Sequence, residues 1–317
     1  MHVLIVKTSS MGDVVHALPA VSDLLRHCPG VTIDWLVEAP FAAIPKLHAG
    51  VQRVIPIAWR KWRRNLLQAN TREAIAKARS ELRAERYDLV LDLQGLLKSA
   101  LWGLQAHGPL VGYDRHSARE PLASMFYSRS LRVPRDEHAI VRCRQLAAMA
   151  LGYPMPTSAP AFGLRVPTLS WPLPARFAAL IPNASRPEKL WPEARWVAVG
   201  RKLRSAGLVP VVLWGSEAEQ TMAERIAADC SGTVPPFLKV AEMTALLAQA
   251  RCVVGLDTGF SHLAAALGRP VVGIYCDHEP GLAGITGPGP VASVGGKGRV
   301  PKLQEVMALV EQQLAAL

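Results

Sequence analysis

Ser9, Ser10, Gly12 and Asp13 stand close together, just after the apolar run His2–Val6. The run predicts a buried strand, and the periodicity that begins at Asp13 predicts an amphipathic helix. Ligands of open α/β sheets bind at the carboxyl ends of the strands, where helix N-termini also offer free N–H groups. Two hydroxyls, several amides and one carboxylate at such an edge predict a ligand site.

A second segment of this kind lies in the other half of the chain. An apolar run, Cys252–Leu256, delivers Asp257 to the predicted start of a helix, and Gly259 lets backbone approach a ligand closely. The positive end of a helix can bind a diphosphate without a metal. The pattern equally fits a helix cap at Asp257 and a packed core histidine at His262.

Two further turns follow predicted strands in the same half. Asn183–Trp191 contains Lys189, a flexible point charge suited to phosphate, although an isolated loop lysine is more often only solvated. Trp214–Glu219 contains two glutamates, and a carboxylate there can accept both hydroxyls of a ribose or can cap the next helix. Three such turns at one sheet edge predict a nucleotide-diphosphate pocket.

The tract Trp59–Arg64 packs four cations and two tryptophans into six residues. Arginine pairs with phosphate or carboxylate, and tryptophan suits an interface. The tract therefore predicts contact with RNA, a membrane surface or an acidic substrate, and the tryptophans weaken the alternative of a charged helix face. Arg119-Glu120-Pro121 is a smaller polar cluster with the same expected role.

The elements that must position these residues alternate between strands and helices, which predicts an α/β protein with two parallel, helix-flanked sheets. The proline-rich segment Pro154–Pro174, which carries almost no charge, is the expected linker and hinge. The expected strands are His2–Val6, Val31–Val37, Val51–Ile57, Leu89–Leu93, Phe177–Ile181, Val209–Trp214, Cys252–Leu256 and Val271–Tyr275. The main expected helices are Asp13–Leu25, Thr71–Arg86, Val141–Leu151, Pro192–Ala206, Glu217–Asp229, Met243–Ala250, Thr258–Leu267 and Lys302–Ala316.

Composition limits the class of protein. The 317 residues are 50% hydrophobic and 19% charged, which is typical of a packed protein of about two domains. Residues 1–165 carry 22 Lys and Arg against 13 Asp and Glu, whereas residues 166–317 carry 14 against 12. The first half is therefore expected to face an anion. Five scattered cysteines indicate reduced thiols in a cytosolic protein, and we expect no signal peptide and no transmembrane segment.

Several motifs are absent from the sequence. It has no phosphate-binding GxxxxGK[ST] loop, no GxGxxG after either opening strand, no zinc-type spacing and no Asp-x-Asp pair. An RNA-binding protein would explain the basic first half but would lack a known RNA-binding pattern. A non-catalytic nucleotide-sugar-binding protein would explain the second half but not the turn at Ser9–Asp13.

Taken together, these residues resemble the heptosyltransferases of glycosyltransferase family 9, over nearly the whole chain. The matching segments are KTSSMGD at Lys7–Asp13, the basic tract Trp59–Arg64, AREPLAS at Ala118–Ser124 and LDTGFSHLAAAL at Leu256–Leu267. The resemblance implies a GT-B fold, with two Rossmann-like parallel-sheet domains that face an interdomain cleft. Residues 1–160 would bind the acceptor, residues 161–300 would bind ADP-heptose, and residues 301–317 would form a helix that packs back on the first domain.

The resemblance implies inverting, metal-independent transfer of L-glycero-D-manno-heptose from ADP-heptose to the first Kdo of Kdo2-lipid A. AREPLAS together with KTSSMGD favours this acceptor, and the alternative is a related family 9 enzyme that acts on an already heptosylated core. We expect no cofactor, no nucleic-acid partner and a peripheral location on the cytoplasmic face of the inner membrane.

The same resemblance assigns roles to the candidate residues. Asp13 would be the general base. The donor would be bound by Ser185, Lys189, Glu219, Asp257, Thr258, Gly259 and His262. The acceptor would be bound by Ser9, Ser10, Gly12, Arg60, Arg63, Arg64 and Arg119. Two segments depart from the family pattern: relatives often carry two hydroxyl residues where this chain has Ala184 and Ser185, so Asn183 is a candidate substitute, and Cys276–Glu279 replaces a loop containing Gly-Pro-Thr.

Overall fold

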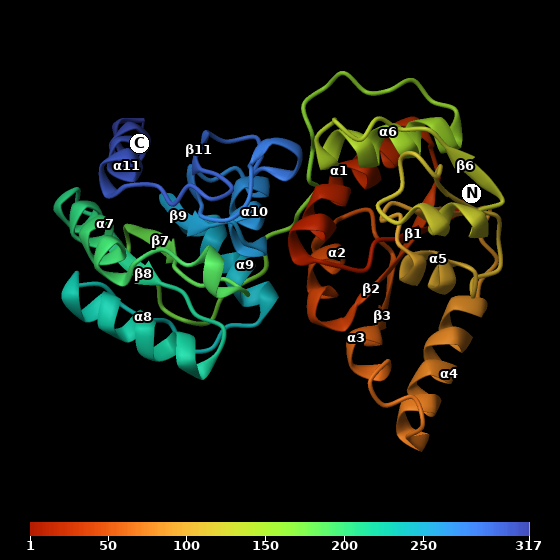
Figure 1. The fold of residues 1–317 in the computed structure, drawn as a ribbon, viewed down its shortest axis with the longest axis horizontal. Helices are drawn as coiled ribbons and strands as arrows, with labels where there is room; N and C mark the ends of the chain where they lie inside the picture. Colours follow the sequence, from red (N-terminus) through yellow and green to blue (C-terminus); the bar gives the residue numbers. More distant parts are fainter. Residues whose placement is uncertain (317) are drawn as a thin grey trace. The chain divides into compact units, whose positions relative to one another are not determined.

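The chain folds into two compact units, which are described here by a computed structural model for residues 1–316 (Figure 1). The first unit is Met1–Arg165, and the second begins at Val166. Each unit contains one sheet in which all paired strands are parallel. The predicted α/β architecture of two parallel sheets is therefore confirmed.

The first unit has a six-stranded sheet in the order β3-β2-β1-β4-β5-β6. Its strands are β1 (His2–Val6), β2 (Thr32–Glu38), β3 (Arg53–Ile57), β4 (Leu89–Asp92), β5 (Leu110–Tyr113) and β6 (Arg129–Leu131). Its α-helices are α1 (Met11–His27), α2 (Ala43–Leu47), α3 (Trp59–Trp62), α4 (Ala69–Arg83), α5 (Leu97–Gly103) and α6 (Ala139–Leu151), and the 3₁₀ segments are η1 (Ala39–Phe41) and η2 (Pro121–Phe126).

Burial on both faces explains why the central strands of this sheet are continuous apolar runs. Val3 to Val6 of β1 are fully buried. Residues of α4 and α5, including Leu82 and Trp102, pack with Leu4 and Val6 on one face. The helices α1 and α6 pack against each other and are joined by a buried ion pair in which Arg144 donates two hydrogen bonds to Asp23, at 2.6 and 3.1 Å.

The second unit has a five-stranded sheet in the order β11-β10-β9-β7-β8. Its strands are β7 (Phe177–Ile181), β8 (Val209–Val212), β9 (Cys252–Leu256), β10 (Val271–Tyr275) and β11 (Val291–Gly295). Its α-helices are α7 (Glu193–Ser205), α8 (Glu217–Asp229), α9 (Val240–Gln249), α10 (Gly259–Ala266) and α11 (Leu303–Ala315), and its 3₁₀ segments are η3 (Pro187–Lys189) and η4 (Gly281–Ala283).

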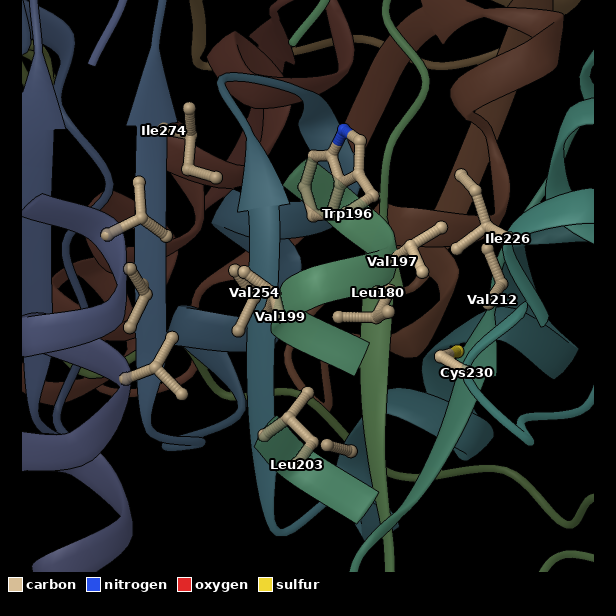
Figure 2. Packing of buried hydrophobic residues seen from close by; sticks show 14 of the residues in the cluster. Leu180, Trp196, Val197, Val199, Leu203, Val212, Ile226, Cys230, Val254 and Ile274 are labelled. Atoms are coloured by element: carbon tan, nitrogen blue, oxygen red, sulfur yellow. The ribbon is translucent and has the colours of Figure 1, made fainter. Parts of the chain in front are cut away.

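The core of the second unit lies between its sheet and the helices α7, α8 and α11. Figure 2 shows Leu180, Val254 and Ile274 on neighbouring strands, with Trp196 and Leu203 of α7 packed over them. Trp196 is fully buried. Since all paired strands of this sheet are parallel, their carboxyl ends lie together at one edge.

The linker is shorter than the sequence predicts. Residues 154–165 belong to the first unit, where Phe162 is buried and Arg144 donates to the Ser158 carbonyl at 2.9 Å. The backbone N–H of Arg165 donates to Leu47 at 2.8 Å. Residues 154–165 are therefore an ordered part of the first unit. The connection between the two units lies after Arg165.

The terminal helix α11 contributes to the core of the second unit. Val306 and Val310 of α11 are fully buried in the core of the second unit. The indole of Trp191 donates to the Pro301 carbonyl at 2.9 Å and anchors the segment just before the helix. The apolar face of α11 thus completes the sheet of its own unit. Leu317, the last residue of the expected helical segment, lies outside the described residues.

The sequence did not predict β5, β6 and β11, which lie at or near the edges of the two sheets. β5 and β6 are short, with four and three residues, and β6 and β11 are exposed or half-buried and so lack the apolar runs of central strands. All five cysteines are free thiols. Within residues 1–316, no helix is both long and apolar enough to span a bilayer.

Candidate functional site

The loop after β1 is held in place by one neutral side chain, Gln94. Its carbonyl oxygen accepts hydrogen bonds from the backbone N–H of Thr8 at 2.6 Å and from the Thr8 hydroxyl at 2.7 Å. Its amide donates to the Ser9 carbonyl at 2.7 Å. Gln94 follows β4, the strand beside β1, so two neighbouring strand ends build this part of the edge. Gly12 lies in the first turn of α1.

Asp13 sits at the start of α1 with its carboxylate turned back to that loop. One oxygen accepts from the Ser10 backbone N–H at 2.8 Å and from the Ser10 hydroxyl at 3.0 Å, and the other pairs with Arg119 at 3.2 Å. Burial raises the pKa of Asp13, but the charges of Lys7 and Arg119 and the hydrogen bonds from Ser10 outweigh it and hold the pKa below its usual value. The side chain is still 22% exposed.

A second carboxylate, Glu38, ends β2 at the same edge and was not predicted as a site residue. Its side chain accepts from the backbone N–H of Arg60 at 3.2 Å. Burial raises the pKa of Glu38, against the opposing effect of Lys98, Arg60 and Arg63. The signal for it in the sequence was a charged residue directly after the apolar run Trp35–Val37.

Lys98, in the first turn of α5, is the other residue that sequence reasoning missed. Its ammonium donates to the Ser9 hydroxyl at 2.6 Å. Burial and the charge of Arg60 lower the pKa of Lys98, while Glu38 and Asp13 oppose that shift. Ser9, Asp13, Arg60 and Arg63 thus lie around Lys98, and Ser10 and Arg119 join this charged cluster through Asp13. Arg64 is exposed on the turn after α3.

In the second unit, Asp257 directly follows β9 and pairs with two predicted site residues. The Lys189 ammonium donates to one carboxylate oxygen at 2.6 Å, and Nε2 of His262 lies 3.3 Å from the other. Burial raises the pKa of Asp257, but hydrogen bonds and charge from His262 and Lys189 outweigh it, and the pKa lies well below its usual value. Strand, loop and helix residues therefore meet at one point of this edge.

Thr258 and Gly259 begin α10 beside that ion pair. Thr258 is the N-cap residue, and its buried hydroxyl has no hydrogen-bond partner among residues 1–316. Buried hydroxyls normally have a partner, and the first turn of a helix attracts anions. Lys189, the Thr258 hydroxyl and this helix end form a set of donors suited to a phosphate group.

The remaining candidate donor-site residues are placed less directly. Glu219 accepts from the Gly215 backbone N–H at 2.8 Å and so closes the turn before α8. Ser185 is exposed. The amide nitrogen of Asn183 donates to the Leu213 carbonyl at 2.8 Å, while its oxygen is buried without a partner. In this arrangement one of the two N–H groups of the Asn183 amide is engaged by Leu213, and only the other is left as a donor for a diphosphate.

The unusual loop Cys276–Glu279 borders the same place. A small pocket is lined by Lys189, Asp257, Ile274, Cys276, Asp277 and His278. Asp277 pairs with Arg186 at 2.7 Å, which ties this loop to the Asn183–Trp191 loop. Among residues 1–316, no group of three His, Cys, Asp or Glu side chains is arranged to bind a metal ion.

Comparison with known proteins gives the class of molecule. The family model described as glycosyltransferase family 9 (heptosyltransferase) matches residues 75–308. The E. coli heptosyltransferase WaaC with ADP matches with a TM-score of 0.91 and 37% identity, covering 99% of this chain and 100% of that chain. The same enzyme with ADP-2-deoxy-2-fluoro heptose gives a TM-score of 0.86 at 37% identity, with 100% and 99% coverage. The chain belongs to glycosyltransferase family 9, the heptosyltransferases, and has their GT-B fold.

Two relatives indicate the particular branch of the family. The lipopolysaccharide heptosyltransferase 1 of Pseudomonas aeruginosa is 44% identical over 291 residues, which are 90% of this chain and 82% of that protein. The protein of the same name from Escherichia coli strain K12 is 42% identical over 292 residues, 90% of each chain.

Proposed function

We propose that this chain transfers L-glycero-D-manno-heptose from ADP-heptose to the first Kdo of Kdo2-lipid A, in lipopolysaccharide core synthesis. The similarity to proteins named lipopolysaccharide heptosyltransferase 1 supports the acceptor. The WaaC structures with ADP and with a fluorinated ADP-heptose support the donor. The observation that carries the chemistry is Asp13, an ionised and partly exposed carboxylate in a ring of cations.

Asp13 would act as the general base that accepts the proton of the attacking acceptor hydroxyl. Transfer with inversion requires attack on the face of the sugar opposite the leaving group. A carboxylate with a lowered pKa is a weak base. It suffices when the bond to the leaving group is largely broken before the proton moves, as in an oxocarbenium-like transition state.

The leaving group would be stabilised by protein charges in place of a metal. As ADP departs, negative charge develops on its diphosphate. The Lys189 ammonium, the unpartnered Thr258 hydroxyl and the N–H groups at the start of α10 would meet that charge. Glu219 would accept from the ribose, and Asp257, His262, Gly259 and Ser185 would border the donor.

The acceptor side would be recognised by charge. Kdo carries a carboxylate and lipid A carries phosphates, both of which pair well with guanidinium groups. Arg60, Arg63, Arg64 and Arg119 supply these groups around the Ser9–Asp13 loop, and Ser9, Ser10 and Gly12 add hydroxyl and backbone donors. Because this acceptor is a membrane lipid, we place the reaction at the cytoplasmic face of the inner membrane, with the enzyme bound peripherally.

The deciding assay measures ADP release from ADP-heptose with Kdo2-lipid A and, separately, with an acceptor that already carries the first heptose. Turnover only with Kdo2-lipid A supports the proposal. Turnover only with the heptosylated acceptor would identify a related family 9 enzyme of the later core instead. The anomeric configuration of the product, read by NMR, tests inversion, and an unchanged rate in EDTA tests metal independence.

A further inference from the structure

An apolar turn lies at the end of the basic tract in the first unit. The backbone N–H of Gln68 donates to the Asn65 carbonyl at 3.1 Å, which closes a four-residue turn with Leu66 and Leu67 at its centre. Leu66 is 46% exposed and Leu67 is 91% exposed. In Figure 1 the segment between α3 and α4 lies far from the strands of its own sheet.

Two leucines at the tip of a turn need an explanation. Turn centres normally carry glycine, proline, asparagine, aspartate or serine. A side chain as exposed as Leu67 gains nothing from burial in this fold, and an apolar tip next to charged residues is typical of a surface that contacts another phase or molecule.

The turn follows helix α3, whose two tryptophans pack against α5, and four cations precede the turn. The rings of Trp59 and Trp62 lie 6.2 and 5.9 Å from the ring of Trp102 in α5, which fixes α3 to the unit. Arg60, Lys61, Arg63 and Arg64 are exposed in the five residues between Trp59 and Asn65. Clusters of four or more Lys and Arg beside apolar side chains are attracted to anionic lipid headgroups.

We propose that the Leu66–Leu67 turn inserts into the headgroup boundary of an anionic bilayer, while the neighbouring cations bind the lipid phosphates. The proposal rests on the proposed function in one respect, that the acceptor is a membrane lipid. An insertion point beside Arg63 and Arg64 would hold the Ser9–Asp13 edge of the same unit at the height of lipid headgroups.

The test uses the full chain and vesicles that contain no acceptor. Co-sedimentation is measured with phosphatidylcholine vesicles and with vesicles that also contain phosphatidylglycerol. We expect binding only to the anionic vesicles, weakened by salt, and binding about tenfold weaker for Leu66→Ser/Leu67→Ser. The matched control is Met149→Ser/Met155→Ser, two exposed apolar residues in an uncharged stretch, which should bind like the parent chain.

A second measurement reports insertion directly. Leu67→Cys in a Cys28→Ser background carries an environment-sensitive dye, since the other four cysteines are buried. The dye emission should shift to shorter wavelength with anionic vesicles. Unchanged vesicle binding of the leucine variant, an equal loss in the methionine control, or an unshifted dye would each overturn the proposal.

Activity on a soluble, de-acylated acceptor separates this inference from the proposed function. The leucine variant should turn over that acceptor at the parent rate, because neither leucine touches the proposed site. A parent chain that binds vesicles but transfers no heptose would contradict the proposed function and leave the membrane contact standing.

Discussion

The two sheet edges each present an aspartate whose pKa is lowered by cations, yet the two carboxylates are held very differently. Asp257 is 12% exposed and lies between Lys189 and His262, which are themselves 18% and 6% exposed. Asp13 is 22% exposed, and its partner Arg119 is 53% exposed. A lowered pKa alone does not identify a base. What sets Asp13 apart is an exposed partner that solvent or substrate can displace, whereas both partners of Asp257 are largely buried.

Replacing Asp13 should have the largest effect. We expect Asp13→Ala to lower kcat by about 10²- to 10⁴-fold, because the change removes the proposed general base. ADP-heptose binding, measured by titration calorimetry, should not change. Asp13→Asn keeps the size of the side chain and should be as inactive, and retained turnover in either variant would remove Asp13 from the role of base.

Lys189→Ala should have the opposite effect to Asp13→Ala, because it should weaken binding of the donor. Losing a charge-assisted hydrogen bond of about 1.5–3 kcal/mol should weaken ADP binding by roughly ten- to a hundredfold. Calorimetry with ADP measures this directly. Arg204→Ala removes an exposed cation from the last turn of α7 and serves as the control. Equal losses in both variants would show only a long-range effect of charge.

Removing Arg63 and Arg64 should affect the acceptor alone. We expect the double change to alanine to raise the acceptor KM about tenfold, since exposed charge pairs contribute modestly, and to leave donor affinity unchanged. Steady-state kinetics with each substrate varied in turn measures both. Lys77→Ala/Arg79→Ala on α4 is the matched control for lost charge. Weakened donor binding would contradict the assignment of the acceptor to the first unit and of the donor to the second.

The pH dependence of kcat/KM should show how much the exposed partner Arg119 contributes to the lowered pKa of Asp13. Arg119 favours the ionised carboxylate, so Arg119→Gln should raise the pKa of Asp13. A base works only when deprotonated, so the acid limb of kcat/KM should move to higher pH, by about one unit or less. A limb that stays in place would mean that another group titrates there.

The smallest effects should come from the two hydroxyls that begin the helices. Ser10 donates to Asp13, so Ser10→Ala should lower the free energy of unfolding by about 1 kcal/mol. Thr258 has no protein partner for its hydroxyl, so Thr258→Val should leave that free energy unchanged and weaken ADP binding only a few-fold. Denaturant unfolding and calorimetry measure the two quantities, and a destabilised Thr258→Val would assign that hydroxyl to the fold.

Much of the fold could be predicted from the sequence because central parallel strands are buried on both faces. Phe177–Ile181 and Cys252–Leu256 are strands with the predicted bounds. Edge strands such as β6 lack that signal, because half of their surface is exposed. The role of residues 154–165 escaped prediction since proline-rich composition does not reveal that Phe162 is buried against the first unit.

Only part of the candidate site could be predicted from the sequence, and the reason is related. Asp257 directly follows β9, and Asp13 and Lys189 lie in the segments that follow β1 and β7, so topology alone places them at an edge. Glu38 and Lys98 reach the same cluster from β2 and α5, and their meeting depends on packing between distant segments. The engagement of the Asn183 amide by Leu213 likewise depends on the position of a neighbouring strand.

Gln94 has a consequence for how this enzyme responds to its surroundings. The side chain that holds the Thr8–Ser9 loop carries no charge and takes up no proton at any physiological acidity. The hydrogen bonds of the Gln94 side chain to the Thr8–Ser9 loop therefore persist when acid or salt changes the charges around them. Variation in activity with acidity or ionic strength would then report on the ionised groups beside this loop, the Lys98 ammonium at the Ser9 hydroxyl among them.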